Sequence, residues 1–74
     1  MNELIEILEE LRPDIDFETE TGLVDNHILE SLDIVVLVGE IRENFDVEIS
    51  AADLTPENFN SAQSIWNLIC SLQD

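Results

Sequence analysis

Hydrophobic residues recur at helical spacing in three stretches of this chain, and each stretch predicts an amphipathic helix. The first helix is expected over residues 3–12, because Pro13 disfavours helical geometry in the residue before it. The second begins at Ser31, with Val35 beside its hydrophobic stripe, and the third lies near the end of the chain. The stripes consist of Leu4, Ile5, Leu8 and Leu11 in the first helix, of Ile34, Leu37, Val38, Ile41 and Phe45 in the second, and of Ala62, Ile65, Trp66, Ile69 and Leu72 in the third.

Polar residues that commonly cap helices stand at the expected starts of these helices. Thr55 precedes Pro56, and this order of N-cap and first helical residue predicts a short helix before the last one. The other expected N-caps are Asn2, Ser31 and Asn60, the last paired with Gln63 in the spacing of a capping box.

The segment 13–30 forms a long connection with little periodicity, and a loop of that length is uncommon unless it has a function. Residues 46–50 form a connector whose weak alternation has no partner strand. We therefore predict an all-α fold: a small bundle of three main helices plus one short helix, with a long first loop, in which residues 1–74 form a single domain. The hydrophobic residues expected to hold the first loop across the helices are Ile15, Phe17, Leu23, Val24, Ile28 and Leu29.

The charge of the chain restricts its partners. With 74 residues and a formal net charge of −16, it has Arg12 and Arg42 as its only Lys or Arg residues. This composition excludes nucleic acid, disfavours an anionic membrane surface, and favours enzymes with basic docking patches. The small size leaves no room for a core and an enclosed cavity of roughly 300 Å³, which argues against an enzyme. A single cysteine, Cys70, and the absence of a long apolar stretch favour a cytoplasmic protein without membrane insertion. We expect it to be a monomer.

A single serine stands directly before the apolar run of the second helix, in the sequence Glu30-Ser31-Leu32-Asp33. The start of a helix has free backbone N–H groups and a partial positive charge, and both favour a phosphate group. We therefore interpret Ser31 as a covalent attachment point. A serine that only caps its helix is the simpler alternative, and the two roles are compatible.

Two further interpretations concern residues near this serine and in the long loop before it. His27, Ser31 and Asp33 have the side chains of a hydrolase triad, but nothing in the sequence supplies an oxyanion hole or a dry pocket. An acidic set has the oxygen spacing of a calcium loop, although Thr19 stands where such a loop needs glycine. We expect neither catalytic residues nor a specific metal site. The acidic set consists of Asp14, Asp16, Glu18 and Asp25.

The stretch from Glu30 to Ile49 resembles the acyl and peptidyl carrier proteins. Their motif is Asp-Ser-Leu, then a helix that ends in a Glu-Phe-Asp-like turn, and then an extended connector with isoleucine; here Phe45-Asp46 occupies the turn. The resemblance implies that Ser31 carries 4′-phosphopantetheine, transferred from coenzyme A by a phosphopantetheinyl transferase. It also implies that the thiol of this arm holds an acyl or aminoacyl group as a thioester for loading ligases or synthases.

The resemblance leaves the pathway open among fatty acid, polyketide and nonribosomal peptide synthesis and D-alanylation, and residues 23–29 resemble the D-alanyl carrier subset. Glu30 replaces the usual aspartate, which we expect to slow modification without abolishing it. The alternative function is a non-covalent acidic interaction module of the same fold that lacks the arm. The residues implied in partner recognition are Glu30, Leu32, Asp33, Val36, Gly39, Arg42 and Glu43.

Overall fold

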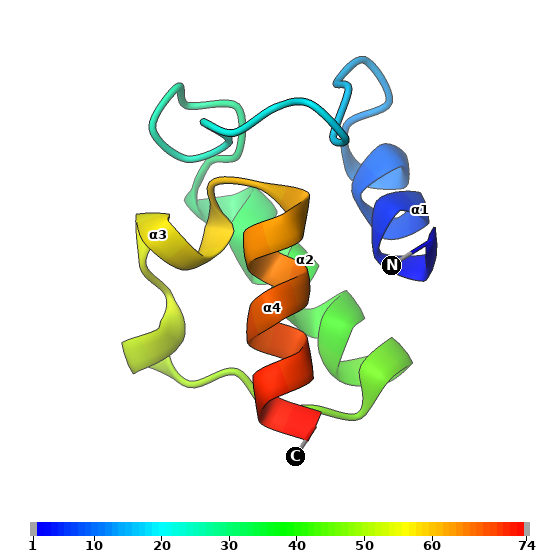
Figure 1. Ribbon diagram of the computed structural model, residues 1–74, viewed down its shortest axis with the longest axis vertical. Coiled ribbons are helices and arrows are strands. Elements are labelled where there is room, and N and C mark those ends of the chain that lie inside the picture. Colours follow the sequence, from blue (N-terminus) through cyan, green and yellow to red (C-terminus); the bar gives the residue numbers. More distant parts are fainter. Residues whose placement is uncertain (1, 74) are drawn as a thin grey trace.

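The computed structural model describes residues 2–73, which form a small helical bundle (Figure 1). α1 (Asn2–Leu11) packs against both α2 (Ser31–Phe45) and α4 (Ala62–Gln73). The short α3 (Pro56–Phe59) packs against α4, and η1 (Ala51–Asp53) is one 3-10 turn that the sequence did not indicate. The predicted all-α fold of three main helices and one short helix is confirmed. α1 lies one residue earlier than expected, and no strand occurs among the described residues.

The core forms where the hydrophobic stripes of the helices meet, as the spacing predicts. Val35, expected beside the stripe of α2, is 65% exposed and lies one helical turn after Ser31 on the outer face of the helix. Trp66 is half-buried, and its ring meets that of Phe45 edge-on with centroids 5.7 Å apart, which joins α4 to α2. The buried residues are Leu4, Leu8, Phe17, Leu23, Leu29, Leu37, Ile41, Val47, Phe59, Ala62, Ile65, Leu68 and Ile69.

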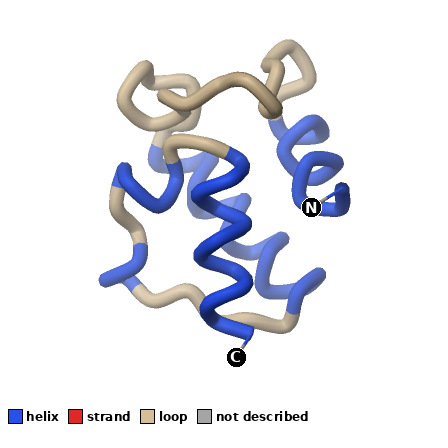
Figure 2. The backbone as a smooth tube through the Cα atoms, viewed as in Figure 1, coloured by secondary structure: helices blue, strands red, loops and turns tan. Residues whose placement is uncertain are grey.

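The long first loop passes over one end of the bundle, from the end of α1 to the start of α2 (Figure 2). Its hydrophobic side chains hold it there, as predicted. Phe17, Leu23 and Leu29 are buried in the core, and three further side chains pack against it. The loop therefore has a defined path although it contains no regular helix or strand. The three half-buried side chains are those of Ile15, Val24 and Ile28.

Hydrogen bonds from Asn60, in the connection between α3 and α4, fasten the middle of this loop. The backbone carbonyl of Asn60 accepts a hydrogen bond from the N–H of Leu23 at 2.8 Å. Its side-chain Oδ1 accepts from the N–H groups of Val24 and Asp25, each at 3.0 Å. Its Nδ2 donates to Oδ2 of Asp25 at 3.1 Å. One asparagine thus satisfies three backbone donors of an otherwise irregular segment.

The structure tests the helix caps expected at Thr55 and Asn60. Thr55 is the N-cap of α3 with proline in the next position, as predicted. The capping box of Asn60 with Gln63 is wrong, because the side chain of Asn60 is bound to the loop. Instead, Oγ of Ser61 accepts a hydrogen bond from the N–H of Ser64 at 3.0 Å, at the start of α4.

The substitution Asn60→Asp is expected to lower the Tm by about 5–10 °C, measured by circular dichroism. It keeps an acceptor for the two loop N–H groups, removes the donor to Asp25 and sets two carboxylates against each other. Asn67→Asp is the matched control, because exposed Asn67 only accepts from Gln63 and an aspartate can still do so. Equal changes of Tm in the two proteins would contradict the assigned role.

Candidate functional site

The start of α2 differs from the expected one in its cap. Glu30 is the N-cap and Ser31 is the first helical residue, so the prediction that Ser31 caps the helix is wrong. The reason is Asp33, whose Oδ2 accepts a hydrogen bond from the N–H of Glu30 at 3.1 Å. Ser31 is exposed, and no hydrogen bond within residues 2–73 engages its hydroxyl. Among these residues the serine oxygen therefore has no partner, and Ser31 lies at the surface.

The first turn of α2 is also tied to the end of α1. Nη2 of Arg12, the residue after α1, donates to Oδ2 of Asp33 at 2.9 Å, in the one ion pair found among residues 2–73. The hydrogen bond from Arg12, followed by that from the backbone of Glu30, lowers the pKa of the Asp33 carboxyl below its usual value. The same carboxylate raises the pKa of Arg12. Asp33 thus stays ionised and holds the turn that carries Ser31.

The lowered pKa of Asp33 makes part of the stability depend on pH. A folded-state pKa below the unfolded value of about 3.8 stabilises the fold above that value, and this contribution is lost as the pH falls through the folded pKa. We expect the difference in free energy of unfolding between the wild type and Asp33→Asn to be constant down to about pH 5 and to shrink below about pH 4. Urea titrations at each pH measure it. A difference that stays unchanged at about pH 2 would contradict the assignment.

The chain that leads into Ser31 is anchored as well. Leu29 is buried, and its N–H donates to the carbonyl of Leu23 at 2.8 Å. Between them, His27 is exposed, as predicted for a solvated loop residue, and has a left-handed backbone with φ 59°. Because Asn60 binds the N–H of Leu23, the connection between α3 and α4 supports the segment that ends at the serine.

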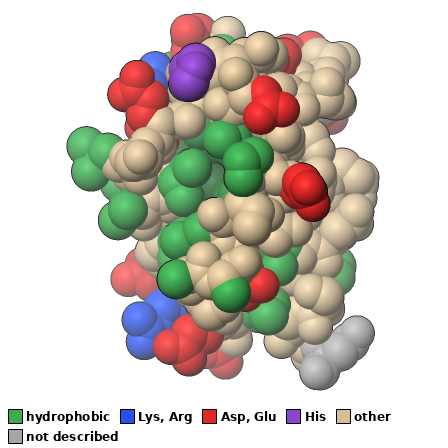
Figure 3. All heavy atoms as spheres, turned by 90° about the vertical axis from the view of Figure 1, so that its left-hand side faces the viewer, with side chains coloured by type: hydrophobic (Ala, Val, Ile, Leu, Met, Phe, Trp, Pro, Cys, Tyr) green, Lys and Arg blue, Asp and Glu red, His purple; other side chains and the backbone are tan. Residues whose placement is uncertain are grey.

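The outer face of α2 next to Ser31 is apolar and exposed. Leu32 is 74% exposed and Val36 is 46% exposed. Val35 also belongs to this face, and its spacing of four residues from Ser31 was the signal that could have placed it there. Figure 3 shows a side of the molecule on which hydrophobic side chains gather among acidic ones. The other predicted recognition residues of this helix that lie exposed are Gly39, Arg42 and Glu43.

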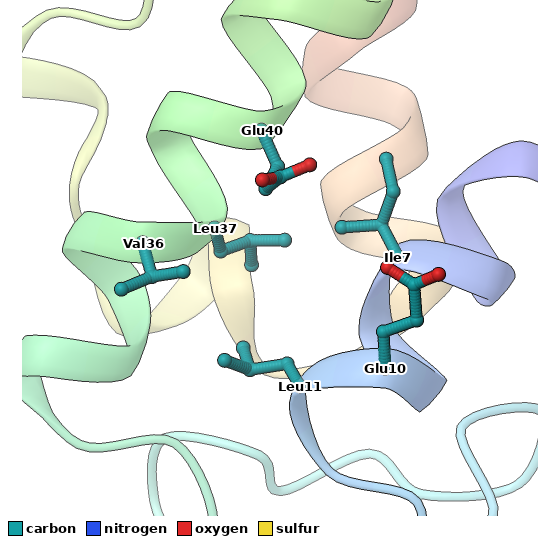
Figure 4. Close-up of a pocket in the computed structure, with 6 residues that line it drawn as sticks. All are labelled: Ile7, Glu10, Leu11, Val36, Leu37 and Glu40. Atoms are coloured by element: carbon teal, nitrogen blue, oxygen red, sulfur yellow. The ribbon is translucent and has the colours of Figure 1, made fainter.

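A hollow of about 150 Å³ lies between α1 and α2 (Figure 4). It has apolar side chains from both helices and two carboxylates, those of Glu10 and Glu40. Its α2 residues lie roughly half a turn around the helix from Ser31, at about 100° per residue. The hollow thus faces α1 and not the serine, and it is not part of the candidate site, although Val36 at its rim also belongs to the exposed face of α2. Its lining residues are Ile7, Glu10, Leu11, Val36, Leu37 and Glu40.

The remaining sequence candidates are not assembled into a second site. Asp33 is bonded to Arg12, and no hydrogen bond in the described part of the chain joins His27 to Ser31 or Asp33. Between residues 2 and 73, no group of three or more His, Cys, Asp or Glu side chains is placed to hold a metal ion. None of the described helices has the length and hydrophobicity needed to span a membrane.

Comparison with known proteins identifies the family to which this chain belongs. The family model for the phosphopantetheine attachment site matches residues 2–69, so this chain belongs to that family. It is also similar to the D-alanyl carrier protein of Streptococcus sanguinis (strain SK36). The two are 29% identical over 73 residues, which cover 97% of this chain and 92% of that protein.

The group that this family attaches covalently is 4′-phosphopantetheine, and the start of α2 fits it. Ser31 provides an exposed hydroxyl without a hydrogen-bond partner in the described residues. The first backbone N–H groups of α2 have no intrahelical acceptors, and they favour the anion of a phosphodiester. The bound group supplies a terminal thiol on a long arm, which can hold a thioester.

Proposed function

We propose that this chain is a carrier protein in which Ser31 bears 4′-phosphopantetheine and presents a thioester-bound group to partner enzymes. The observation that carries this proposal is the exposed hydroxyl of Ser31 in the anchored first turn of α2. A hydroxyl that neither caps the helix nor packs in the core is available to a transferase. Residues 1–74 act as a single carrier domain, and the chemistry is performed by its partners.

We propose that the partners bind the exposed face of α2 beside the serine. Leu32, Val35 and Val36 offer apolar contacts there, in a chain of net charge −16 that attracts basic patches. Glu30 directly precedes the serine and Asp33 follows two residues after it; Asp33 contributes through its hydrogen bonds to Arg12 and to the backbone of Glu30. Gly39, Arg42 and Glu43 extend the face toward the end of α2.

Leu32→Ala tests this face, because Leu32 is exposed and contributes little to the core. We expect kcat/KM for arm transfer to fall about tenfold, the effect of losing a side chain that contributes about 1.4 kcal/mol at an interface. The Tm should change by less than about 3 °C, because exposed substitutions have small effects on stability. Transfer kinetics at limiting protein concentration measure the first effect. An unchanged kcat/KM would show that Leu32 is not part of the surface that binds the transferase.

We propose a D-alanyl group as the cargo and a D-alanine-activating ligase as the loading enzyme. The similarity to the D-alanyl carrier protein of Streptococcus sanguinis extends over nearly the whole chain and supports this cargo. The match within residues 2–69 supports the arm but not a particular pathway. A small aminoacyl thioester needs no cavity for a long acyl chain, so it agrees with an arm exposed to solvent.

The test loads the arm-bearing protein with ATP and such a ligase in the presence of D-alanine or L-alanine, and with an acyl synthetase and a fatty acid. We expect a hydroxylamine-labile mass increase with D-alanine and much less with the other substrates. Efficient loading of the fatty acid, without loading of D-alanine, would contradict the proposed D-alanyl cargo and would still agree with the carrier function. Failure to accept the arm at all, beside an active control carrier, would overturn the carrier function and favour the non-covalent module.

A further inference from the structure

Arg12 occupies a distinctive place in this acidic chain. It is one of two residues of the Lys and Arg type beside 18 carboxylate residues, so most carboxylates have no cation to pair with. Its guanidinium is bound to Asp33, in the first turn of the helix that starts at Ser31. The Arg12 side chain is 39% exposed and that of Asp33 is 20% exposed, so the pair is partly shielded from water.

The contacts form a continuous path from Arg12 to the residue before the serine. Nη2 of Arg12 lies 2.9 Å from Oδ2 of Asp33, and the same oxygen accepts the N–H of Glu30 at 3.1 Å. A carboxylate at this position has several rotamers and two equivalent oxygens. The contact with Arg12 selects the rotamer that also holds the N–H of Glu30. Arg12, the residue after α1, therefore helps to fix the conformation of the backbone that leads directly into Ser31.

We propose that Arg12 is a positioning residue for the transfer of phosphopantetheine to Ser31, acting through Asp33; this inference rests on the proposed function. In that transfer Oγ of Ser31 forms a bond to phosphorus while a P–O bond in the pyrophosphate of coenzyme A breaks. Adenosine 3′,5′-bisphosphate leaves, and the serine proton passes to a base of the transferase. Arg12 touches none of these atoms. It keeps the first turn of α2 in one arrangement before the transferase binds.

Kinetics of arm transfer test this role, with the apo-protein, a broad-specificity phosphopantetheinyl transferase, coenzyme A and magnesium. Arg12→Gln is expected to lower kcat/KM about tenfold at a temperature where the protein is folded, the size typical for loss of a group that orients a reacting residue. Arg12→Lys should recover most of the loss, because one N–H donor and the charge suffice for this contact. Gln73→Glu, at an exposed position of α4, matches the charge change of Arg12→Gln and should behave as the wild type.

Two further measurements separate positioning from a purely structural role. The amide resonance of Glu30 should follow the titration of Asp33, and in Arg12→Gln its midpoint should move to higher pH. The double variant Arg12→Gln/Asp33→Asn should be no slower than Asp33→Asn alone, because both residues act through one path. An Arg12→Gln protein with unchanged kcat/KM, or an Arg12→Lys protein as slow as Arg12→Gln, would overturn the proposal. Additive losses in the double variant would also overturn it, whereas a wild type that accepts no arm would overturn the proposed function itself.

Discussion

Replacing Ser31 by alanine is expected to abolish attachment of phosphopantetheine while the helical fold stays intact. The side-chain oxygen that would accept the arm is removed, and no neighbouring residue supplies a hydroxyl in the first turn of α2. The helix keeps its start, because the hydrogen bond between Glu30 and Asp33 does not involve the serine. We expect the free energy of unfolding to change by less than about 0.5 kcal/mol. Intact mass after incubation with coenzyme A, magnesium and a transferase measures attachment, and circular dichroism measures the fold.

The matched control is Ser50→Ala. Ser50 is also an exposed serine at the start of a helical element; it is the N-cap of η1, where its Oγ lies 3.0 Å from Oδ2 of Asp53. Its loss should leave the mass increase unchanged. If Ser31→Ala still gained one arm, or if Ser50→Ala lost it, the attachment residue would be assigned wrongly. The wild-type protein with no gain in mass would point to the non-covalent module.

Leu37→Ala should be the most destabilising single change in α2. Leu37 is fully buried between α2 and α1 and borders the hollow of about 150 Å³, so the truncation enlarges an existing space that the surrounding helices do not fill. Loss of a buried leucine costs about 2–5 kcal/mol, a large share of the roughly 5–15 kcal/mol that stabilises a typical domain. Urea-induced unfolding followed by circular dichroism measures this loss.

Val36→Ala provides the comparison within the same helical turn. Val36 is 46% exposed, and alanine has the higher helix propensity, so the free energy of unfolding should change by less than about 0.5 kcal/mol. Both residues border the hollow, so the comparison separates a fully buried side chain of α2 from an exposed one. Similar destabilisation by both substitutions would show that the burial assigned to this helix is wrong.

The bundle could be predicted because its signals are local. The stripe through Leu37 and Ile41 shows which side of α2 is buried, and Pro13 shows where α1 has to end. The same reasoning placed Val35 beside the stripe of α2. The position of a hydrophobic residue next to a stripe does not show whether its side chain faces the core or the solvent, and Val35 is exposed. Trp66 was assigned to the inner face, yet it is half-buried at the edge, where its ring meets Phe45.

The candidate site was predictable in its central residue and not in its supports. A serine before an apolar helical run is visible in the sequence, and its exposure agrees with the prediction. Its capping role was predicted wrongly, because both Ser31 and Asp33 are suitable partners for a free N–H and only the fold chooses between them. The roles of Arg12 and Asn60 had no local signal.

By itself, the sequence determined the three main helices, the acidic surface and a serine at the start of the second helix. The spacing of hydrophobic residues and the position of a proline are local features, and net charge is a property of the whole chain. None of them depends on contacts between distant residues, so the sequence alone shows them. Tertiary structure decided how that serine is held. Arg12 meets Asp33 across 21 residues, and Asn60 meets Asp25 across 35. Such contacts need the packing of distant helices to bring donor and acceptor within hydrogen-bonding distance.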